Sequence, residues 1–588
     1  MSASTATPPV AKPAQEGGLS HRQIMTILSG LMLGMFLAAL DQTIVSTAIR
    51  TIGDDLDGLS AQAWVTTAFL ITSTIATPLF GKLSDIYGRK PFFMLAISIF
   101  IVGSALCGLA QSMYMLAAFR AFQGIGAGGI MPLALAIIGD IIPARQRARY
   151  QGYFMAVFAT SSVLGPVVGG FFAGTHSILG FSGWRWIFYV NVPIGILALV
   201  VVQAVLKLDH NRRHHDIDWT GAGMLVVALV PLLIIAEQGR TWGWTSVGAF
   251  SCYLLGVVGV VAFIAAERRA GDDALLPLRL FRNKVFSVGS AQATLIGMGM
   301  FGGLSCIPLY LQIVKGASPT KSGLLLLPLV AGIMSASLIA GQITSRTGRY
   351  KIFPVIGSVL MVLGLATMTQ IGADTALWQT DLYMAIFGFG LGMNMQSIVL
   401  AMQNAVEPRD MGVATSAVTF FRQVGGSLGT AVFLSILFSS AATRVAGQYA
   451  KAKSDPAFQA AAAAHPGQLE KITGSSGLND TSFLHGLDAT LTHPFLIGFS
   501  SAMDLVFLVG AIVLVAAIVL SAMIKEVPLR TVSGQDARRA AEAAAASSTP
   551  VVDSTSVSTS ASTLAAEGAP SDKETPPAAS SGAERPAH

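Results

Sequence analysis

The stretch GKLSDIYGRK, residues 81–90, decides the fold of this chain. It lies between two long apolar segments, and it combines four charged residues with two glycines. The charged residues are Lys82, Asp85, Arg89 and Lys90, and the glycines are Gly81 and Gly88. The same frame of glycine, six residues, glycine and arginine begins again in GQITSRTGRY, residues 341–350. A repeat of this kind indicates two related halves.

The composition indicates that most of the chain lies in a lipid bilayer. Hydrophobic residues make up 53% of the 588 residues and charged residues only 12%, whereas soluble domains carry about 25% charged residues. Apolar runs of about 20 residues, the length that crosses a hydrocarbon core as a helix, fill residues 24–525. The fourteen spans that we predict are residues 24–45, 61–80, 92–111, 114–138, 150–174, 184–206, 218–237, 248–267, 285–313, 322–343, 352–371, 378–402, 411–438 and 494–524.

The distribution of Lys and Arg predicts the orientation of these spans. Short loops rich in Lys and Arg remain in the cytoplasm, and in this count such loops all fall on one side, together with both chain ends. The net charge of +6 is therefore a topology signal. No basic run is interleaved with aromatic residues, so we expect no nucleic-acid partner.

The repeat and the spans together predict two six-helix halves joined by an extra pair of helices. Such repeats are characteristic of secondary transporters, in which the substrate site lies between the halves. The expected segments are a disordered cytoplasmic N-terminus (1–23), a first half (24–206), a linker with two extra helices (207–284), a second half (285–529) with an extracytoplasmic loop (439–493), and a disordered cytoplasmic tail (530–588).

GKLSDIYGRK resembles the signature between the second and third helices of the major facilitator superfamily. Further stretches resemble its fourteen-helix drug:proton antiporter branch, and the resemblance covers residues 24–525. These stretches are LDQTIVSTAI (40–49), RAFQGIGAGGIMPLALAIIGD (120–140), GPVVGG (165–170), FSGWRWIFYVNVPIG (181–195) and LLPLRLFRN (275–283). The resemblance implies an all-α polytopic fold of fourteen transmembrane helices and proton-coupled export of amphipathic, mainly cationic drugs by alternating access.

The charges of the opening stretch have a physical role beyond topology. Asp85 can lie near the cations Arg89 and Lys90, or at the positive end of a neighbouring helix. Gly81 and Gly88 let the backbone turn and approach closely. The resemblance implies that this loop is a conformational latch that favours the outward-open form. Orientation alone would explain the cations, but it leaves Asp85 unexplained.

Two of the charged residues inside predicted membrane helices are candidates for proton coupling. An ionised carboxylate at a helix centre costs about 3 kcal/mol, so Asp41 should face the bundle interior, where it can take up and release protons. Arg120 is permanently charged, and Gln123, one turn on, can share its network. The resemblance implies a part in proton transfer for this arginine. Structural hydrogen bonding is the alternative for both charges. The family motif usually has proline where this chain has Arg50.

The stretch GPVVGG contains small residues at a spacing that permits close helix contact, and its proline frees a backbone carbonyl. These residues are Gly165, Pro166, Gly169 and Gly170. The resemblance implies the antiporter motif, which keeps the resting carrier from leaking protons. Packing alone would give a similar string.

An exporter of amphipathic compounds needs an adaptable apolar cavity, which flexible methionine suits. The candidate cavity residues are Met393, Asn394, Gln396 and Arg422. The same residue types are found in any transmembrane core, so packing is the alternative for each.

The sequence indicates no enzyme, metal site or organic cofactor, and the expected driving force is the proton gradient. The three cysteines are separate packing residues in apolar helices, and the loop histidines should be solvated. These residues are Cys107, Cys252, Cys306, His210, His214 and His215.

We expect a monomer in the bacterial inner membrane whose partners are protons, lipids and small amphipathic substrates. Export of an endogenous lipid, siderophore or secondary metabolite is the alternative, ahead of a polytopic membrane enzyme.

Overall fold

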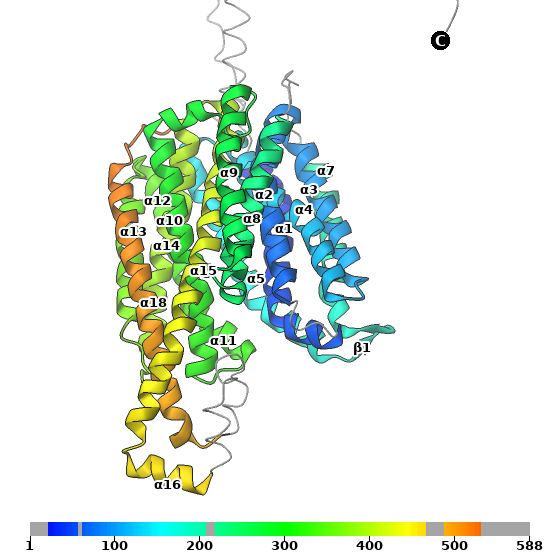
Figure 1. Ribbon diagram of the computed structural model, residues 1–588. Helices are drawn as coiled ribbons and strands as arrows, with labels where there is room; N and C mark the ends of the chain where they lie inside the picture. Colours follow the sequence, from blue (N-terminus) through cyan, green and yellow to red (C-terminus); the bar gives the residue numbers. More distant parts are fainter. Residues whose placement is uncertain (1–20, 57–61, 207–217, 466–486, 531–588) are drawn as a thin grey trace, which may run out of the picture. The chain divides into compact units, whose positions relative to one another are not determined.

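The computed structural model describes residues 21–56, 62–206, 218–465 and 487–530 (Figure 1). The elements within these ranges belong to one unit of the chain, Met1–Arg538. Residues 1–20 and 531–588, which include most of the predicted disordered ends, lie outside the described residues. So do the three loop histidines.

The first half of the described chain is helical apart from one small hairpin. Its elements are α1 (His21–Asp55), α2 (Gln62–Tyr87), α3 (Arg89–Gly108), α4 (Met113–Ile141), α5 (Ala144–Gly174), β1 (Ser177–Ile178), β2 (Phe181–Ser182), η2 (Gly183–Arg185), α6 (Trp186–Tyr189) and α7 (Asn191–Val205). The two short strands pair antiparallel, with Ser177 opposite Ser182.

Two extra helices and the second half follow. Their elements are α8 (Trp219–Trp242), α9 (Val247–Ala270), η3 (Leu278–Arg282), α10 (Lys284–Leu309), η4 (Tyr310–Val314), α11 (Pro319–Leu325), α12 (Leu327–Thr347), α13 (Ile352–Met368), α14 (Leu377–Ala405), η5 (Pro408–Asp410), α15 (Met411–Ala452), α16 (Pro456–Ala464) and α18 (Ala489–Met523). Within the described ranges, 13 helical segments are long and apolar enough to cross a membrane. The predicted span 352–371 forms the shorter apolar helix α13. The predicted all-α polytopic architecture is confirmed.

The structure differs from the predicted spans mainly at helix ends. α1 continues through Arg50 to Asp55, because the chain has no proline there to interrupt it. α15 continues to Ala452 instead of ending at 438. Its extension runs beside α18, where the Tyr449 hydroxyl donates to the Leu491 carbonyl (2.9 Å), and α16 follows at the tip (Figure 1). Much of the expected loop 439–493 is therefore helical.

Glycine-rich helices form the centre of each half, as the internal repeat predicts. A Cβ atom on Gly126 of α4 would lie 2.5 Å from the Ala96 carbonyl oxygen of α3. Likewise, a Cβ atom on Gly390 of α14 would lie 2.6 Å from the Gly357 carbonyl oxygen of α13. Only glycine permits such close helix contacts. α4 thus packs between α2 and α3 as α14 packs between α12 and α13.

The turns that follow α2 and α12 are also equivalent. Gly88 has a φ of 107° and Gly348 a φ of 75°, a region that side chains other than glycine rarely adopt. We call the end of the bundle that contains these turns and the α4–α5, α9–α10 and α14–α15 connections the basic end. The opposite end is the far end.

Candidate functional site

Asp41 lies at the centre of a buried polar cluster. Its side chain has 0% exposure, and the Arg120 Nη1 donates to its Oδ2 at 2.5 Å. Its Oδ1 accepts from Gln123 Nε2 at 3.0 Å and from Asn191 Nδ2 at 2.7 Å. Both amides also donate to the Ser104 hydroxyl. The structure thus brings the three residues that we selected for proton coupling into one network.

The cluster joins four helices of the first half. Asp41 comes from α1, Ser104 from α3, Arg120 from α4 and Asn191 from the first residue of α7. The Arg120 guanidinium also lies 4.0 Å from the ring centre of Phe69 on α2, a cation–π contact. Because an ion pair enclosed by protein is sensitive to any change in its charges, the cluster can couple protonation of a carboxylate to helix packing.

Neither Asn191 nor Ser104 was predicted from the sequence as a site residue. Asn191 lies within FSGWRWIFYVNVPIG (181–195), and the signal that could have identified it is an amide at the start of an apolar run. Polar residues inside membrane helices face other helices. Ser104 gives no such signal, because serine is common in membrane helices and often donates to its own backbone.

The glycines of GPVVGG pack α5 against the segment of α1 that follows Asp41. A Cβ atom on Gly165 would overlap the Thr43 side chain, and one on Gly169 would lie 2.9 Å from the Ile44 carbonyl oxygen. The Thr43 hydroxyl donates to the Ser161 carbonyl of α5 at 3.1 Å. A Cβ atom on Gly323 of α11, in the second half, would lie 3.0 Å from the Pro166 ring. Gly170 is half-buried.

The latch candidates lie where the two halves meet at the basic end. Asp85 pairs with Arg89, and its Oδ2 accepts from the backbone N–H of Val413, the third residue of α15 (3.0 Å). Val413 N–H is one of the N-terminal donors that a helix cannot satisfy internally. Gly81 allows this approach, because a Cβ atom there would overlap Ser416 of α15.

The other two charges of this loop have different partners. Arg89 also donates from Nε to Asp140 Oδ2 at 2.8 Å, and it is buried between the two aspartates. Lys90, a predicted latch residue, donates to the Gln203 carbonyl of α7 at 2.9 Å. Asp140, the last residue of the quoted stretch 120–140, was missed because its partner lies 51 residues earlier in the chain.

Two further arginines join the halves at the basic end. Arg145 donates to the carbonyls of Ser345 and Arg346 at the end of α12. The buried Arg147 donates to Gln403 Oε1 of α14 at 2.5 Å, and Gln403 in turn donates to Thr415 of α15. Burial lowers the pKa of Arg147 to about 10, so its guanidinium stays charged at neutral pH. These contacts close the basic end.

Arg279, in the α9–α10 connection, forms ion pairs outside the predicted site, which we call the Arg279 clamp. Arg279 donates from two nitrogens to Asp410, at 2.9 and 2.8 Å, and from Nε to Asp272. These carboxylates raise the pKa of Arg279, the hydrogen bond to Asp410 most strongly. Lys82 donates to the Asp272 carbonyl at 2.8 Å. The linker of the extra helices is therefore attached to α2 and to the start of α15.

Two of the four candidate cavity residues, Asn394 and Met393, pack within the second half. Asn394 accepts from Gln292 and Ser358, and it donates to the Gly390 carbonyl, so it belongs to a hydrogen-bonded cluster within the second half. Met393 packs in a small apolar cluster with residues of α12 and α13. Gln396 is buried, and Arg422 is half-buried.

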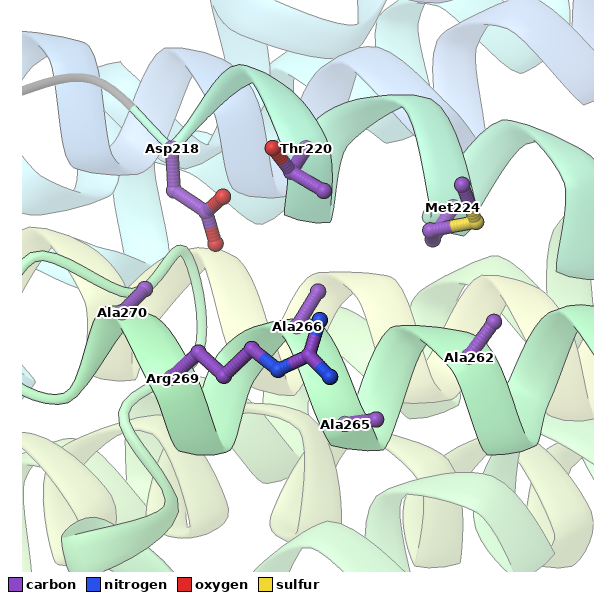
Figure 2. Close-up of a pocket in the computed structure, with 8 residues that line it drawn as sticks. All are labelled: Asp218, Thr220, Met224, Ala262, Ala265, Ala266, Arg269 and Ala270. Atoms are coloured by element: carbon purple, nitrogen blue, oxygen red, sulfur yellow. The ribbon is translucent and has the colours of Figure 1, made fainter.

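A groove of about 490 Å³ lies between the two extra helices near the basic end. Figure 2 shows Asp218 and Thr220 at the start of α8, facing a row of alanines and Arg269 on α9. None of the residues that we selected from the sequence lines this groove. Within the described ranges no group of three His, Cys, Asp or Glu side chains could hold a metal ion, and the three cysteines are free.

Comparisons with known proteins agree with this architecture. A family model described as Major Facilitator Superfamily matches residues 31–430. The MFS-type transporter Rv1877 of Mycobacterium tuberculosis is 36% identical over 524 residues, which are 89% of this chain and 72% of that protein. Multidrug transporter protein MdtP of Bacillus subtilis is 36% identical over 419 residues, 71% of this chain and 76% of that protein. The solved proton:xylose symporter XylE shares the fold, with a TM-score of 0.55 at 15% identity, over 88% of this chain and 100% of that one.

Proposed function

Because this chain belongs to the major facilitator superfamily of membrane transporters, we propose that it exports amphipathic compounds, drugs among them, in exchange for protons. It is a multi-pass membrane protein and a transporter rather than an enzyme. The likeness to a multidrug transporter supports drugs as substrates. The observation that carries proton exchange is the buried ion pair between Asp41 and Arg120.

The proposal includes an orientation. The basic end faces the cytoplasm of a bacterial cell, because loops rich in Lys and Arg are retained there. The latch, the Arg147–Gln403 bond and the Arg279 clamp then close the cytoplasmic side, and the described state is the outward-facing one. A single chain provides both halves, so a monomer suffices. The proton gradient drives transport without a metal or an organic cofactor.

Protonation of Asp41 weakens its ion pair with Arg120, between Oδ2 and Nη1. The ionised carboxylate accepts hydrogen bonds from Arg120, Gln123 and Asn191. A proton that arrives from outside removes the negative charge that holds Arg120, and the protein interior makes an unpaired guanidinium costly. α1 and α4 therefore have to move relative to each other until Arg120 finds water or another acceptor.

α5 can carry this movement to the cytoplasmic side. Its glycines pack on α1 next to Asp41, while Arg145 at its other end holds the carbonyls of Ser345 and Arg346. A shift of α1 thus reaches a contact between the halves through one rigid helix. Release of that contact and of the Asp85 latch opens the cytoplasmic side to substrate, as alternating access requires.

The test is exchange in proteoliposomes that contain the purified protein and a trapped pH indicator. An imposed pH gradient should drive uptake or release of amphipathic dyes, and each dye should produce proton flow in the opposite direction. Empty liposomes give the leak of each dye. Dye movement that is independent of the pH gradient would contradict antiport. If no drug-like dye of the panel moves and a lipid or metabolite does, the lipid or metabolite replaces drugs as the proposed substrate.

A further inference from the structure

Arg422 is a membrane arginine that has no partner in the described part of the chain. Neither an ion pair nor a hydrogen bond involves its guanidinium, although it lies within α15 and is half-buried. Arg89 and Arg120, by contrast, are both paired with aspartates. A permanently charged group at bilayer depth is costly, and such residues face a cavity or mark a substrate path. Arg422 is therefore a candidate for binding a ligand.

Helix geometry places Arg422 deep in the membrane on an inward face. It is eleven residues from the start of α15, or about 16 Å along the helix, which is near the middle of a hydrocarbon core of about 30 Å. Thr415 lies two turns earlier on the same face, and it accepts from Gln403, whose amide also donates to the Leu135 carbonyl of α4. The face of Arg422 is thus directed toward α14 and the first half.

The same geometry brings Gln396 to the level of Arg422. α14 and α15 are antiparallel and hydrogen-bonded to each other between Gln403 and Thr415 (2.8 Å). Gln396 is seven residues from Gln403, as Arg422 is seven from Thr415. Each therefore lies about 10 Å deeper, on the helix face that carries Gln403 or Thr415. The Gln396 amide has no hydrogen bond within the described ranges. A guanidinium and an amide that both lack partners form a matched pair of donors.

We infer that Arg422 and Gln396 bind the carboxylate of an amphipathic anionic substrate. A planar guanidinium binds a carboxylate through two parallel hydrogen bonds, and the amide of Gln396 supplies a further donor. Four carboxylates are already paired with other arginines: Asp41 with Arg120, Asp85 and Asp140 with Arg89, and Asp410 with Arg279. Within the described ranges no ion pair joins Arg422 to any carboxylate. The site is therefore positive, and it departs from the cationic substrates that we expected from the sequence.

This assignment rests on the proposed export function. It also predicts how the rate of export depends on the membrane potential. If one anion leaves the cell for each proton that enters, two charges move in the direction favoured by an inside-negative membrane potential. Export of a carboxylate is then accelerated by that potential more strongly than export of a neutral analogue. A cationic substrate in the same exchange moves no net charge.

Three probes that differ only in their terminal group test the inference. They are 11-(dansylamino)undecanoic acid, its methyl ester and the corresponding primary amine. Binding to the purified wild-type protein in nanodiscs is measured by dansyl fluorescence at pH 7. The carboxylate should bind about 10-fold more tightly than the ester, and the amine should bind most weakly. Arg422→Gln should reduce carboxylate affinity to that of the ester and leave the ester unchanged.

Further variants separate binding from folding. Arg422→Lys should keep part of the preference for carboxylate, and Gln396→Leu should weaken carboxylate binding less than Arg422→Gln does. Arg269→Gln, which removes an arginine of the α8–α9 groove, should leave all three affinities unchanged. A wild-type protein that binds the three probes equally, or binds the amine best, overturns the assignment. So does a preference for carboxylate that survives in Arg422→Gln.

Transport of the same probes distinguishes the two proposals. If the carboxylate binds through Arg422 but no probe exchanges for protons in proteoliposomes, the anion site stands and proton antiport fails. If the ester and the amine exchange for protons and the carboxylate is not preferred, antiport stands and the anion site fails. A valinomycin-imposed, inside-negative potential should accelerate carboxylate export, and the ester should respond less.

Discussion

The carboxylate of Asp85, on α2, accepts a hydrogen bond from the backbone N–H of Val413, near the start of α15, with 3.0 Å between Oδ2 and N. The same carboxylate pairs with Arg89. One side chain of the first half thus holds the positive end of a helix in the second half. This contact joins the halves without requiring any particular side chain on α15, because its donor belongs to the backbone.

Asp85→Asn should shift the protein toward the form that is open at the basic end. Hydrogen bonds to a charged group contribute about 1.5–3 kcal/mol, so the open population should rise about 10-fold or more. Spin labels at the exposed positions Gln146 and Thr347, one in each half, measure the distance between the basic ends. Lys90→Gln is the matched control, because Lys90 contacts Gln203 of its own half. Equal distance distributions for Asp85→Asn and the control would exclude the latch.

Gly165→Ala should impair coupling, because the new methyl group would overlap Thr43 two residues after Asp41. Overpacking of this kind costs about 1–3 kcal/mol. We expect slower drug-dependent proton flow and a larger proton leak in proteoliposomes. Gly174→Ala, on the same helix, adds a methyl group with no atom within 4 Å and should behave as the wild type. A leak that rises equally in both variants would indicate a general defect of α5.

Asn191→Ala should lower the rate of exchange about 10-fold or more while dye binding persists. The substitution removes one donor from Asp41 Oδ1 and one from the Ser104 hydroxyl, and loss of a hydrogen bond to a buried charged group costs about 1.5–3 kcal/mol. Stopped-flow proton uptake and equilibrium dye binding measure the two properties. Asn191→Asp, which keeps the shape but not the amide donor, should not restore exchange. Normal exchange in Asn191→Ala would remove this residue from the coupling cluster.

Gln403→Leu should destabilise the closed basic end. Arg147 would lose its acceptor at 2.5 Å, although the backbone carbonyls of Gly139 and Ile142 remain. The free energy of unfolding should fall by about 1–3 kcal/mol, which thermal unfolding in detergent detects. Gln342→Leu, at an exposed glutamine of α12, is the matched control. An unchanged midpoint for Gln403→Leu would mean that Arg147 finds another acceptor at no cost.

The sequence predicts the architecture of this chain well, because a bilayer makes length and hydropathy decisive. It predicts helix ends poorly, as α15 shows. The residues after 438 are polar but still suited to a helix, and α18 gives them a surface to pack on. Hydropathy marks where the membrane ends, and it does not mark where hydrogen bonding along a helix stops.

Some residues of the candidate sites can also be predicted from the sequence, whereas their distant partners cannot. Asp41, Arg120 and Gln123 could be selected because a charge or amide in an apolar helix must find a partner. Their shared partner Asn191 is 150 residues from Asp41, and no local pattern encodes that distance. The partner of Asp85 in the second half is a backbone N–H, which has no sequence signal at all. The neighbours of Lys90 in the sequence predict a place in the latch, whereas its ammonium group donates to the Gln203 carbonyl of α7.

The central claim, that Asp41 couples protons to transport, is tested most directly by proton-to-dye exchange in proteoliposomes of Asp41→Asn. Asparagine keeps the shape of the side chain but cannot take up and release a proton. We predict that the variant binds dye, exchanges dye for dye, and gives no proton flow coupled to dye. Asp504→Asn, which replaces another carboxylate in a membrane helix, should remain coupled. Full proton coupling in Asp41→Asn would contradict the account and place the proton site elsewhere.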